Sequence, residues 1–240
     1  KRVKFKFLLI LYSFMIDFND LLNNFLKREL RGKIIGKYYP SEIGNCLRRV
    51  WYSYKLPREV DTEMLKFFEA GNMVHNLVAD VIKSDKNPSI ALLATETPVF
   101  LTSEDYVVSG RMDDILLVRV DGKIYILEVK SVSSLNYTKE AKEPHIAQLQ
   151  LYMQSSGIHD GLILYVERNT LKSSVFNVKF DPEIVKSSLS RFSKLNSHLK
   201  ADTIPEPEAR INKKELGWQC EKCQYRQECY TQNPATKELQ

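Results

Sequence analysis

The stretch YILEVKSVSS, residues 125–134, places Glu128 and Lys130 two positions apart inside an otherwise apolar run. Side chains alternate along a β-strand, so Ile126, Glu128 and Lys130 would share one face. A buried charge pair rarely adds enough stability to explain its presence in a core. We therefore expect these two charges to act on something other than each other.

A second acidic position lies one hairpin earlier in the chain. The run SGRMDDIL, residues 109–116, has a strand pattern, and Asp-Gly at 121–122 is a strong turn signal. Either Asp113 or Asp114 can then face inward beside Glu128. Two neighbouring carboxylates repel each other unless a cation lies between them. Oxygen ligands of this kind suit Mg²⁺ or Mn²⁺.

Such a site has the chemistry of phosphodiester cleavage. A bound divalent ion polarises the phosphodiester and lowers the pKa of a water, and Lys130 would stabilise the negative charge that develops. The alternative is an exposed hairpin whose Asp, Glu and Lys form a solvated ladder of ion pairs. These residues alone leave both interpretations open.

Composition sets the outer limits. The chain has 240 residues, 43% of them hydrophobic, and 35 Lys and Arg against 30 Asp and Glu give a formal charge of +5. This excludes a disordered chain and is compatible with a polyanionic partner such as DNA. Residues 1–18 begin with basic and then apolar residues, but no cleavage site follows and the run is too short to span a bilayer. We expect a cytoplasmic protein with no membrane contact; export is the less favoured interpretation.

Hydrophobic periodicity predicts an α/β fold. Its order is helices, three strands, a helix, two strands and a helix. Residues 201–218 are rich in Pro and charge, which predicts a surface linker, and we expect the last ten residues to be frayed. Helical spacing covers residues 17–31, 61–83, 144–156 and 181–200, with a short helix around Cys46, and alternation covers 94–101, 106–120, 123–132, 161–170 and 173–180.

The four cysteines predict a metal site. Cys220, Cys223 and Cys229 lie in CEKCQYRQEC, residues 220–229, and Cys46 is the natural fourth ligand. A disulfide framework is typical of small secreted domains, which does not fit this chain. Four thiolates hold either a tetrahedral zinc ion or an iron–sulfur cluster. The site would join the helix near the N-terminus to the C-terminal tail.

The order of these motifs resembles the PD-(D/E)XK nuclease superfamily in its RecB-like branch. One cysteine before the core and three after it are similar to the iron–sulfur members, and most of all to the fourth family of the numbered CRISPR-associated proteins. The resemblance spans roughly residues 38 to 230. It rests on the patterns Gly-x-x-Asp, Glu-x-Lys and Gln-x-x-x-Tyr, which are here Gly110 and Asp113, Glu128 and Lys130, and Gln148 and Tyr152.

The resemblance implies a restriction-endonuclease-like core with a mixed central sheet flanked by helices at residues 38–200. A helical extension (1–37) would precede it, and a linker with the three-cysteine segment (201–240) would follow. The implied activity is exonuclease cleavage of single-stranded DNA ends, 5′ to 3′, in CRISPR spacer acquisition beside integrase subunits. A RecB-like repair or viral nuclease, or a DNA-binding module that has lost cleavage, is the alternative.

The resemblance also implies ligands and catalytic residues. His75, in GNMVHNLV, would complete the Mg²⁺ or Mn²⁺ shell with Asp113, Glu128 and the carbonyl of Val129, and the family spacing favours Asp113 over Asp114. The implied cofactor of the cysteines is a [4Fe-4S] cluster, with zinc less favoured. The implied catalytic residues are Asp113, Glu128, Lys130, Gln148 and Tyr152, and the implied cluster ligands are Cys46, Cys220, Cys223 and Cys229.

Two helices carry the expected DNA contacts. Gln148 and Tyr152 are four residues apart and share a helical face, with His145 one turn earlier. The run NCLRRVWY, residues 45–52, interleaves charge and aromatic rings as single-strand binders do. The alternative for this run is a helix that packs its rings inward around the cluster. The DNA-binding candidates are Arg48, Arg49 and Tyr52.

Overall fold

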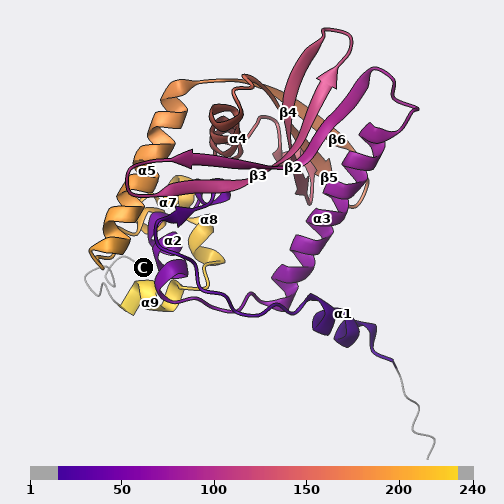
Figure 1. The fold of residues 1–240 in the computed structure, drawn as a ribbon. Helices are drawn as coiled ribbons and strands as arrows, with labels where there is room; N and C mark the ends of the chain where they lie inside the picture. Colours follow the sequence, from indigo (N-terminus) through magenta and orange to yellow (C-terminus); the bar gives the residue numbers. More distant parts are fainter. Residues whose placement is uncertain (1–15, 232–240) are drawn as a thin grey trace, which may run out of the picture.

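A mixed six-stranded sheet forms the centre of the computed structural model, which describes residues 16–231 (Figure 1). The strand order is β1-β3-β4-β5-β6, and β2 pairs with the other edge of β3. The pairs β1–β3 and β4–β5 are parallel and the others antiparallel, so the predicted α/β class with a mixed sheet is confirmed. The strands are β1 (Lys37–Tyr38), β2 (Ile90–Thr102), β3 (Val107–Val118), β4 (Lys123–Val132), β5 (Asp160–Glu167) and β6 (Ser173–Lys179).

Helices cover both faces of this sheet. On one face α4 packs Leu149 and Met153 against Ile126 and Ile163, and on the other face α3 packs Val74 against Val129. Figure 1 shows α3 and α4 on different sides of the strands. The helices are α1 (Phe18–Leu26), α2 (Leu47–Lys55), α3 (Thr62–Lys83), α4 (Glu143–Ser156) and α5 (Pro182–Lys200), with 3-10 turns η1 (Pro40–Glu42) and η2 (Leu135–Tyr137).

Local signals set most of the element ends. Asp181 caps α5 by accepting a hydrogen bond from Glu183 N, and Gly157 ends α4 with φ +73°. The hairpin between β3 and β4 turns at Gly122, which has φ +68°. Two expected ends differ. The first helix ends at Leu26 instead of near Arg31, and Cys46 is the N-cap residue of α2 instead of lying inside that helix.

The sheet is split beside Gly110. One edge of β3 pairs with β2 from Val107 to Val118, but the other edge pairs with β1 only at Val107 and Val108, and with β4 only from Asp114 onward. The turn η1 approaches β3 in this interval, and a Cβ on Gly110 would lie 2.9 Å from Pro40 Cδ. Glycine is needed here because a side chain would push the two segments apart.

The C-terminal segment packs against α2. The stretch predicted as a linker contains α6 (Glu208–Ile211) and α7 (Lys213–Leu216), and α8 (Trp218–Glu221) and α9 (Arg226–Thr231) follow. Tyr225 joins the core cluster that contains Tyr38, Trp51 and Tyr52. Figure 1 shows these C-terminal helices beside α2, which lies more than 150 residues earlier in the chain.

Two expectations concern residues beyond this range. The apolar run at the N-terminus and the frayed C-terminal end fall almost wholly on residues 1–15 and 232–240, outside the described residues. From residue 16 to residue 231, no helix is both long and apolar enough to cross a bilayer.

Candidate active site

At the gap between β1 and β4 in the sheet, Asp113 contacts both strand β4 and helix α3. Asp113 lies one residue before β3 begins to pair with β4, and its Oδ2 accepts a hydrogen bond from Val129 N at 2.8 Å. The carboxylate thus replaces the missing strand partner. His75 Nδ1, on α3, lies 3.5 Å from the same oxygen. The residue that the family spacing favours therefore contacts both the helix layer and β4.

Glu128 lies on β4 near Asp113, and it is only 1% exposed. Its Oε1 lies 2.5 Å from Lys130 Nζ. Its Oε2 is buried, and no donor within the described chain reaches it. Burial raises the pKa of Glu128 to about 7, because the attraction of Lys130 offsets only part of the desolvation and Asp113 repels the charge further. Glu128 Oε2 is thus a buried acceptor to which no residue from 16 to 231 donates.

Lys130 starts a chain of hydrogen bonds toward α4. Its Nζ donates to Gln148 Oε1 at 3.1 Å, and Gln148 Nε2 donates to the Tyr152 hydroxyl at 2.8 Å. Burial lowers the pKa of Lys130, but Glu128 more than compensates, so the net pKa is raised and the ammonium stays charged at neutral pH. The structure therefore brings together Glu128, Lys130, Gln148 and Tyr152.

Asp114 faces a cavity of about 350 Å³ on the α3 side, which His75, Asp80 and Glu96 also line. Asp114 is 4% exposed, and its burial, with the neighbouring Asp113, raises its pKa to about 6. Burial disfavours a charged His75, but Asp113 and Glu128 outweigh burial and raise its pKa. Asp113 lines the same cavity, but among the two acids of the MDDI run only Asp113 also accepts a hydrogen bond from β4 through its side chain.

His145 contacts a core residue, Tyr165, and not the acidic residues of the site. Its Nδ1 lies 2.8 Å from the hydroxyl of Tyr165, which also accepts a hydrogen bond from Lys142 N. Burial lowers the pKa of His145 to about 3, and Lys130 and Lys142 add to this effect. His145 is therefore neutral and orients the start of α4.

The four cysteines line one pocket between α2 and the C-terminal helices. All four are free thiols. Cys229 Sγ lies 3.8 Å from Nη1 of both Arg48 and Arg210. Burial raises the pKa of Cys220, and the three other thiols add to this effect. The sulfurs share a pocket, but between residues 16 and 231 no three Cys, His, Asp or Glu side chains have a ready metal-binding arrangement.

Two of the DNA-binding candidates are buried. Arg48 is 6% exposed, and its Nε donates to Pro205 O at 2.6 Å. Tyr52 is 1% exposed, and its ring stacks on Tyr225 with centroids 5.4 Å apart. The C-terminal segment covers this face of α2, which favours the alternative of a helix that packs its rings inward over contacts of Arg48 and Tyr52 with DNA. Arg49 remains partly exposed.

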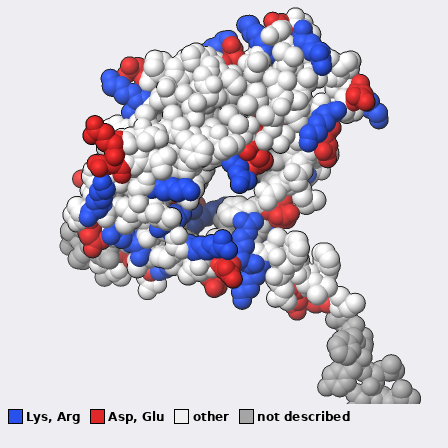
Figure 2. Space-filling model, in the orientation of Figure 1, with Lys and Arg blue, Asp and Glu red and all other residues white. Residues whose placement is uncertain are grey.

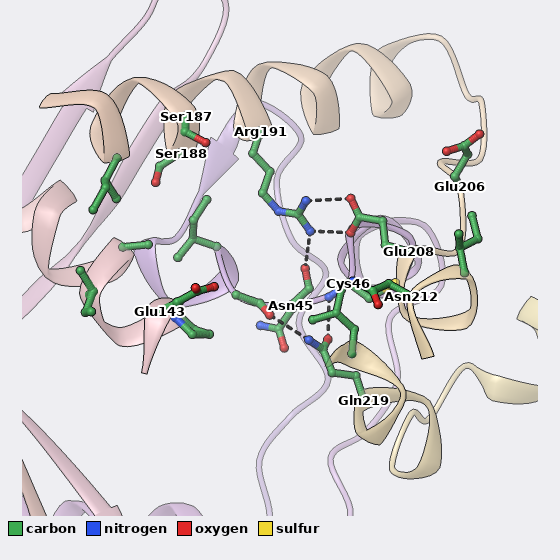
Figure 3. Close-up of a pocket in the computed structure, with 18 of the residues that line it drawn as sticks. Asn45, Cys46, Glu143, Ser187, Ser188, Arg191, Glu206, Glu208, Asn212 and Gln219 are labelled. Carbon is green, nitrogen blue, oxygen red and sulfur yellow. Dashed lines mark hydrogen bonds and ion pairs between the residues drawn. The ribbon is translucent and has the colours of Figure 1, made fainter. Parts of the chain in front are cut away.

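Three polar residues that the sequence did not indicate hold the loop before Cys46 (Figure 3). Arg191, on α5, donates to both carboxylate oxygens of Glu208 at 2.7 and 2.6 Å and to Asn45 O at 2.7 Å. Glu208 Oε2 accepts from Leu47 N at 2.9 Å. Gln219 Oε1 accepts from Cys46 N at 2.7 Å. The partners of these polar side chains lie far away along the chain and leave no local signal in the sequence, so only the fold reveals this role.

Solved structures share this fold. The protein SSO0001 has 19% sequence identity and a TM-score of 0.58 over 86% of this chain and 90% of its own. An alkaline exonuclease from Laribacter hongkongensis, solved also in complex with dAMP, has 13% identity and a TM-score of 0.50 over 77% of this chain and 95% of its own. At such identities the likeness concerns the fold.

The sequence itself matches a family of known proteins. No curated protein matches it. The model of the PD-(D/E)XK nuclease superfamily matches residues 36–230, which include the split sheet, the acidic site and all four cysteines. The chain therefore belongs to the PD-(D/E)XK nuclease superfamily.

Proposed function

We propose that this nuclease is a metal-dependent exonuclease that trims single-stranded DNA ends at the site of Asp113 and Glu128. The observation that carries the proposal is Glu128 Oε2, a buried carboxylate oxygen for which the described chain supplies no donor. A buried acceptor of this kind is costly unless a ligand satisfies it. The nearby Asp113 repels it, which a cation between the two would reverse.

The donor set fits a hard divalent ion. Asp113, Glu128, the carbonyl of Val129 and His75 would hold Mg²⁺ or Mn²⁺, because carboxylate and carbonyl oxygens suit these ions. Bound there, the ion polarises a phosphodiester and lowers the pKa of a water. The raised pKa of Glu128 favours binding at neutral and alkaline pH, where the carboxyl loses its proton most easily.

The protein's own side chains would position and stabilise the reacting phosphate. Lys130 is a fixed cation between Glu128 and Gln148, so it faces the negative charge that develops on the phosphoryl oxygens. Tyr152 holds Gln148, which in turn orients Lys130. Hydrogen bonds thus hold Lys130, Gln148 and Tyr152 in place before DNA arrives.

Exonuclease action has support from resemblance and from surface charge. The motif order resembles CRISPR-associated exonucleases, which implies 5′ to 3′ trimming in spacer acquisition and integrase partners. An alkaline exonuclease shares the fold, and its structure holds dAMP. Figure 2 shows a hollow between α3 and the α2 region with Lys and Arg side chains around it, as a polyanionic strand requires. A RecB-like nuclease outside CRISPR fits the same site.

The cysteine pocket would hold a [4Fe-4S] cluster, with zinc as the alternative. Four thiols that line one pocket are the donor set of both, and the guanidinium groups of Arg48 and Arg210 lie near Cys229 Sγ. Absorption near 400 nm with iron and zinc analysis of anaerobically purified protein decides between them.

We expect the variant Cys46→Ser to lose the metal and to be less stable as a whole, because a metal at Cys46 would join the two ends of the chain. A variant with full metal content and an unchanged melting temperature would exclude this role.

A cleavage assay tests the proposed activity. End-labelled single-stranded DNA is incubated with the wild type, Glu128→Gln and Lys130→Ala, with and without Mn²⁺. We expect cleavage only by the wild type with Mn²⁺, while the variants still bind DNA. Lys172→Ala, an exposed lysine on the β5–β6 turn, is the matched control and should cut normally. Wild-type rates in either site variant would show that the site is misplaced, and wild-type binding without cleavage would favour the non-cleaving module.

A further inference from the structure

Polar side chains also gather at the carboxyl ends of β4 and β5, beside the proposed active site. These strands are parallel neighbours, so their carboxyl ends meet at one edge of the sheet, where open α/β sheets bind ligands. Ser131 follows Lys130 on β4, and Arg168 is the first residue after β5. The nuclease chemistry proposed above uses neither residue.

Arg168 is a half-buried guanidinium for which the described part of the chain supplies no counter-ion. Its Nη1 donates to both O and Oγ of Ser131, each at 3.3 Å. Its backbone N donates to Val132 O at 3.0 Å, so the residue is fixed at the strand end. Within residues 16–231, no carboxylate pairs with this guanidinium, and its Nη2 and Nε donate no hydrogen bond. An arginine held in this way is suited to a phosphate, which it binds through two parallel N–H groups.

Phe67 supplies an aromatic surface next to this cation. Its ring centroid lies 5.6 Å from Arg168 Cζ, and the side chain is 55% exposed although α3 has an apolar side to bury it. An exposed ring beside an arginine is the combination on which single-stranded bases stack. Stacking does not depend on base identity, as trimming of any sequence requires.

The helix connects this pair to the catalytic metal ligands. Phe67 precedes His75 by eight residues, or about 12 Å along α3. Gly71 lies midway, and even a Cβ there would already contact Ser131 Oγ at 3.5 Å. Residue 71 thus lies next to β4, and no side chain of this residue separates Phe67 from His75.

We propose that Arg168 and Phe67 form a nucleotide subsite, in which Arg168 binds a DNA phosphate and Phe67 stacks a base a few nucleotides from the scissile bond. This subsite rests on the proposed nuclease function. It lets a single strand be held at two points, at the metal ligands and at the ends of β4 and β5. Both residues are positioning residues, and neither reaches the reacting atoms.

Substrate length separates this role from a structural one. The variants Arg168→Ala, Arg168→Lys and Phe67→Ala are compared with Lys172→Ala as control on two substrates: a 12-nucleotide single strand, and thymidine 5′-(p-nitrophenyl phosphate), which has one phosphodiester and cannot reach the subsite. We expect Arg168→Ala and Phe67→Ala to raise KM for the oligonucleotide about fivefold or more, the effect of losing one stacked base or phosphate contact, with kcat unchanged. Neither variant should alter cleavage of the short substrate, and Arg168→Lys should restore part of the affinity.

Equal losses on both substrates, or no loss on either, would overturn the subsite. If the wild type cuts neither substrate, the proposed function fails and the subsite is tested by binding alone. In that case fluorescence anisotropy of the labelled oligonucleotide should show a Kd about fivefold weaker for Arg168→Ala than for Lys172→Ala. Equal Kd values would reject the subsite independently of cleavage.

Discussion

The charge of Glu128 should make the metal-free protein less stable as the pH rises. Burial raises its pKa to about 7 in the folded state, against 4.5 for an ordinary glutamate. A folded pKa above the unfolded one means that protonation favours folding. The stabilising contribution is complete below pH 4.5 and disappears as the pH rises through 7. At about 1.4 kcal/mol per pKa unit, the loss amounts to about 3 kcal/mol.

Urea denaturation in metal-free buffer from pH 4.5 to 8 measures this loss. Glu128→Gln cannot ionise at this position, so the free energy of unfolding of the wild type should fall by about 3 kcal/mol more than that of the variant. Glu140→Gln, at an exposed loop position, should follow the wild type. Adding Mn²⁺ at pH 8 should stabilise the wild type and leave Glu128→Gln nearly unchanged, because the ion binds the ionised carboxylate.

Parallel profiles for the wild type and Glu128→Gln would refute this reasoning. They would show that the carboxyl is hydrated or satisfied by a donor in solution. Stabilisation of both proteins by Mn²⁺ to the same extent would place the ion elsewhere. Neither result depends on a cleavage assay, so the acidic site is tested as a binding site before it is tested as a catalyst.

Three further measurements follow from the structure. Affinity for Mn²⁺, measured by calorimetry, should rise with pH up to about 7 and then level off, because the ion displaces the proton of Glu128; a pH-independent affinity would contradict this. Tyr38→Phe should cost about 1–3 kcal/mol in thermal or urea unfolding, because its fully buried hydroxyl donates to Asn196 Oδ1 at 2.7 Å, and no loss would show that water replaces it. Gly110→Ala should lower the free energy of unfolding by about 1–3 kcal/mol and weaken Mn²⁺ binding, because its Cβ would lie 2.9 Å from the ring of Pro40 in η1. Gly32→Ala, which has open space around it, is the control and should leave both quantities unchanged.

Local signals in the sequence were enough to predict the strands and helices of the core. Alternation gave the three strands around the Asp-Gly turn, and Asp181 and Gly157 marked helix ends by interactions within a few residues. The shared face of Glu128 and Lys130 was predictable for the same reason. These features depend only on neighbours along the chain, so a single sequence contains them.

Long-range contacts could not be predicted in this way. Parity alone allows either Asp113 or Asp114 to face inward, and the distinction arises where pairing between β3 and β4 stops. Arg48 and Tyr52 looked like surface residues because nothing in α2 shows that a segment more than 150 residues later covers them. The burial of that segment could not be predicted either, because Pro205 is buried although the residues around it show no apolar periodicity.

The contacts that complete the start of α2 have a consequence for synthesis of the chain. The backbone N–H groups of Cys46 and Leu47 bond to Gln219 and Glu208, which leave the ribosome much later. Until Glu208 and Gln219 have been synthesised, these two acceptors are absent and the amides of Cys46 and Leu47 bond to water. A ligand that reached Cys46 before Cys229 was synthesised would therefore find the cysteine pocket incomplete, so the pocket forms only after the C-terminal helices have left the ribosome.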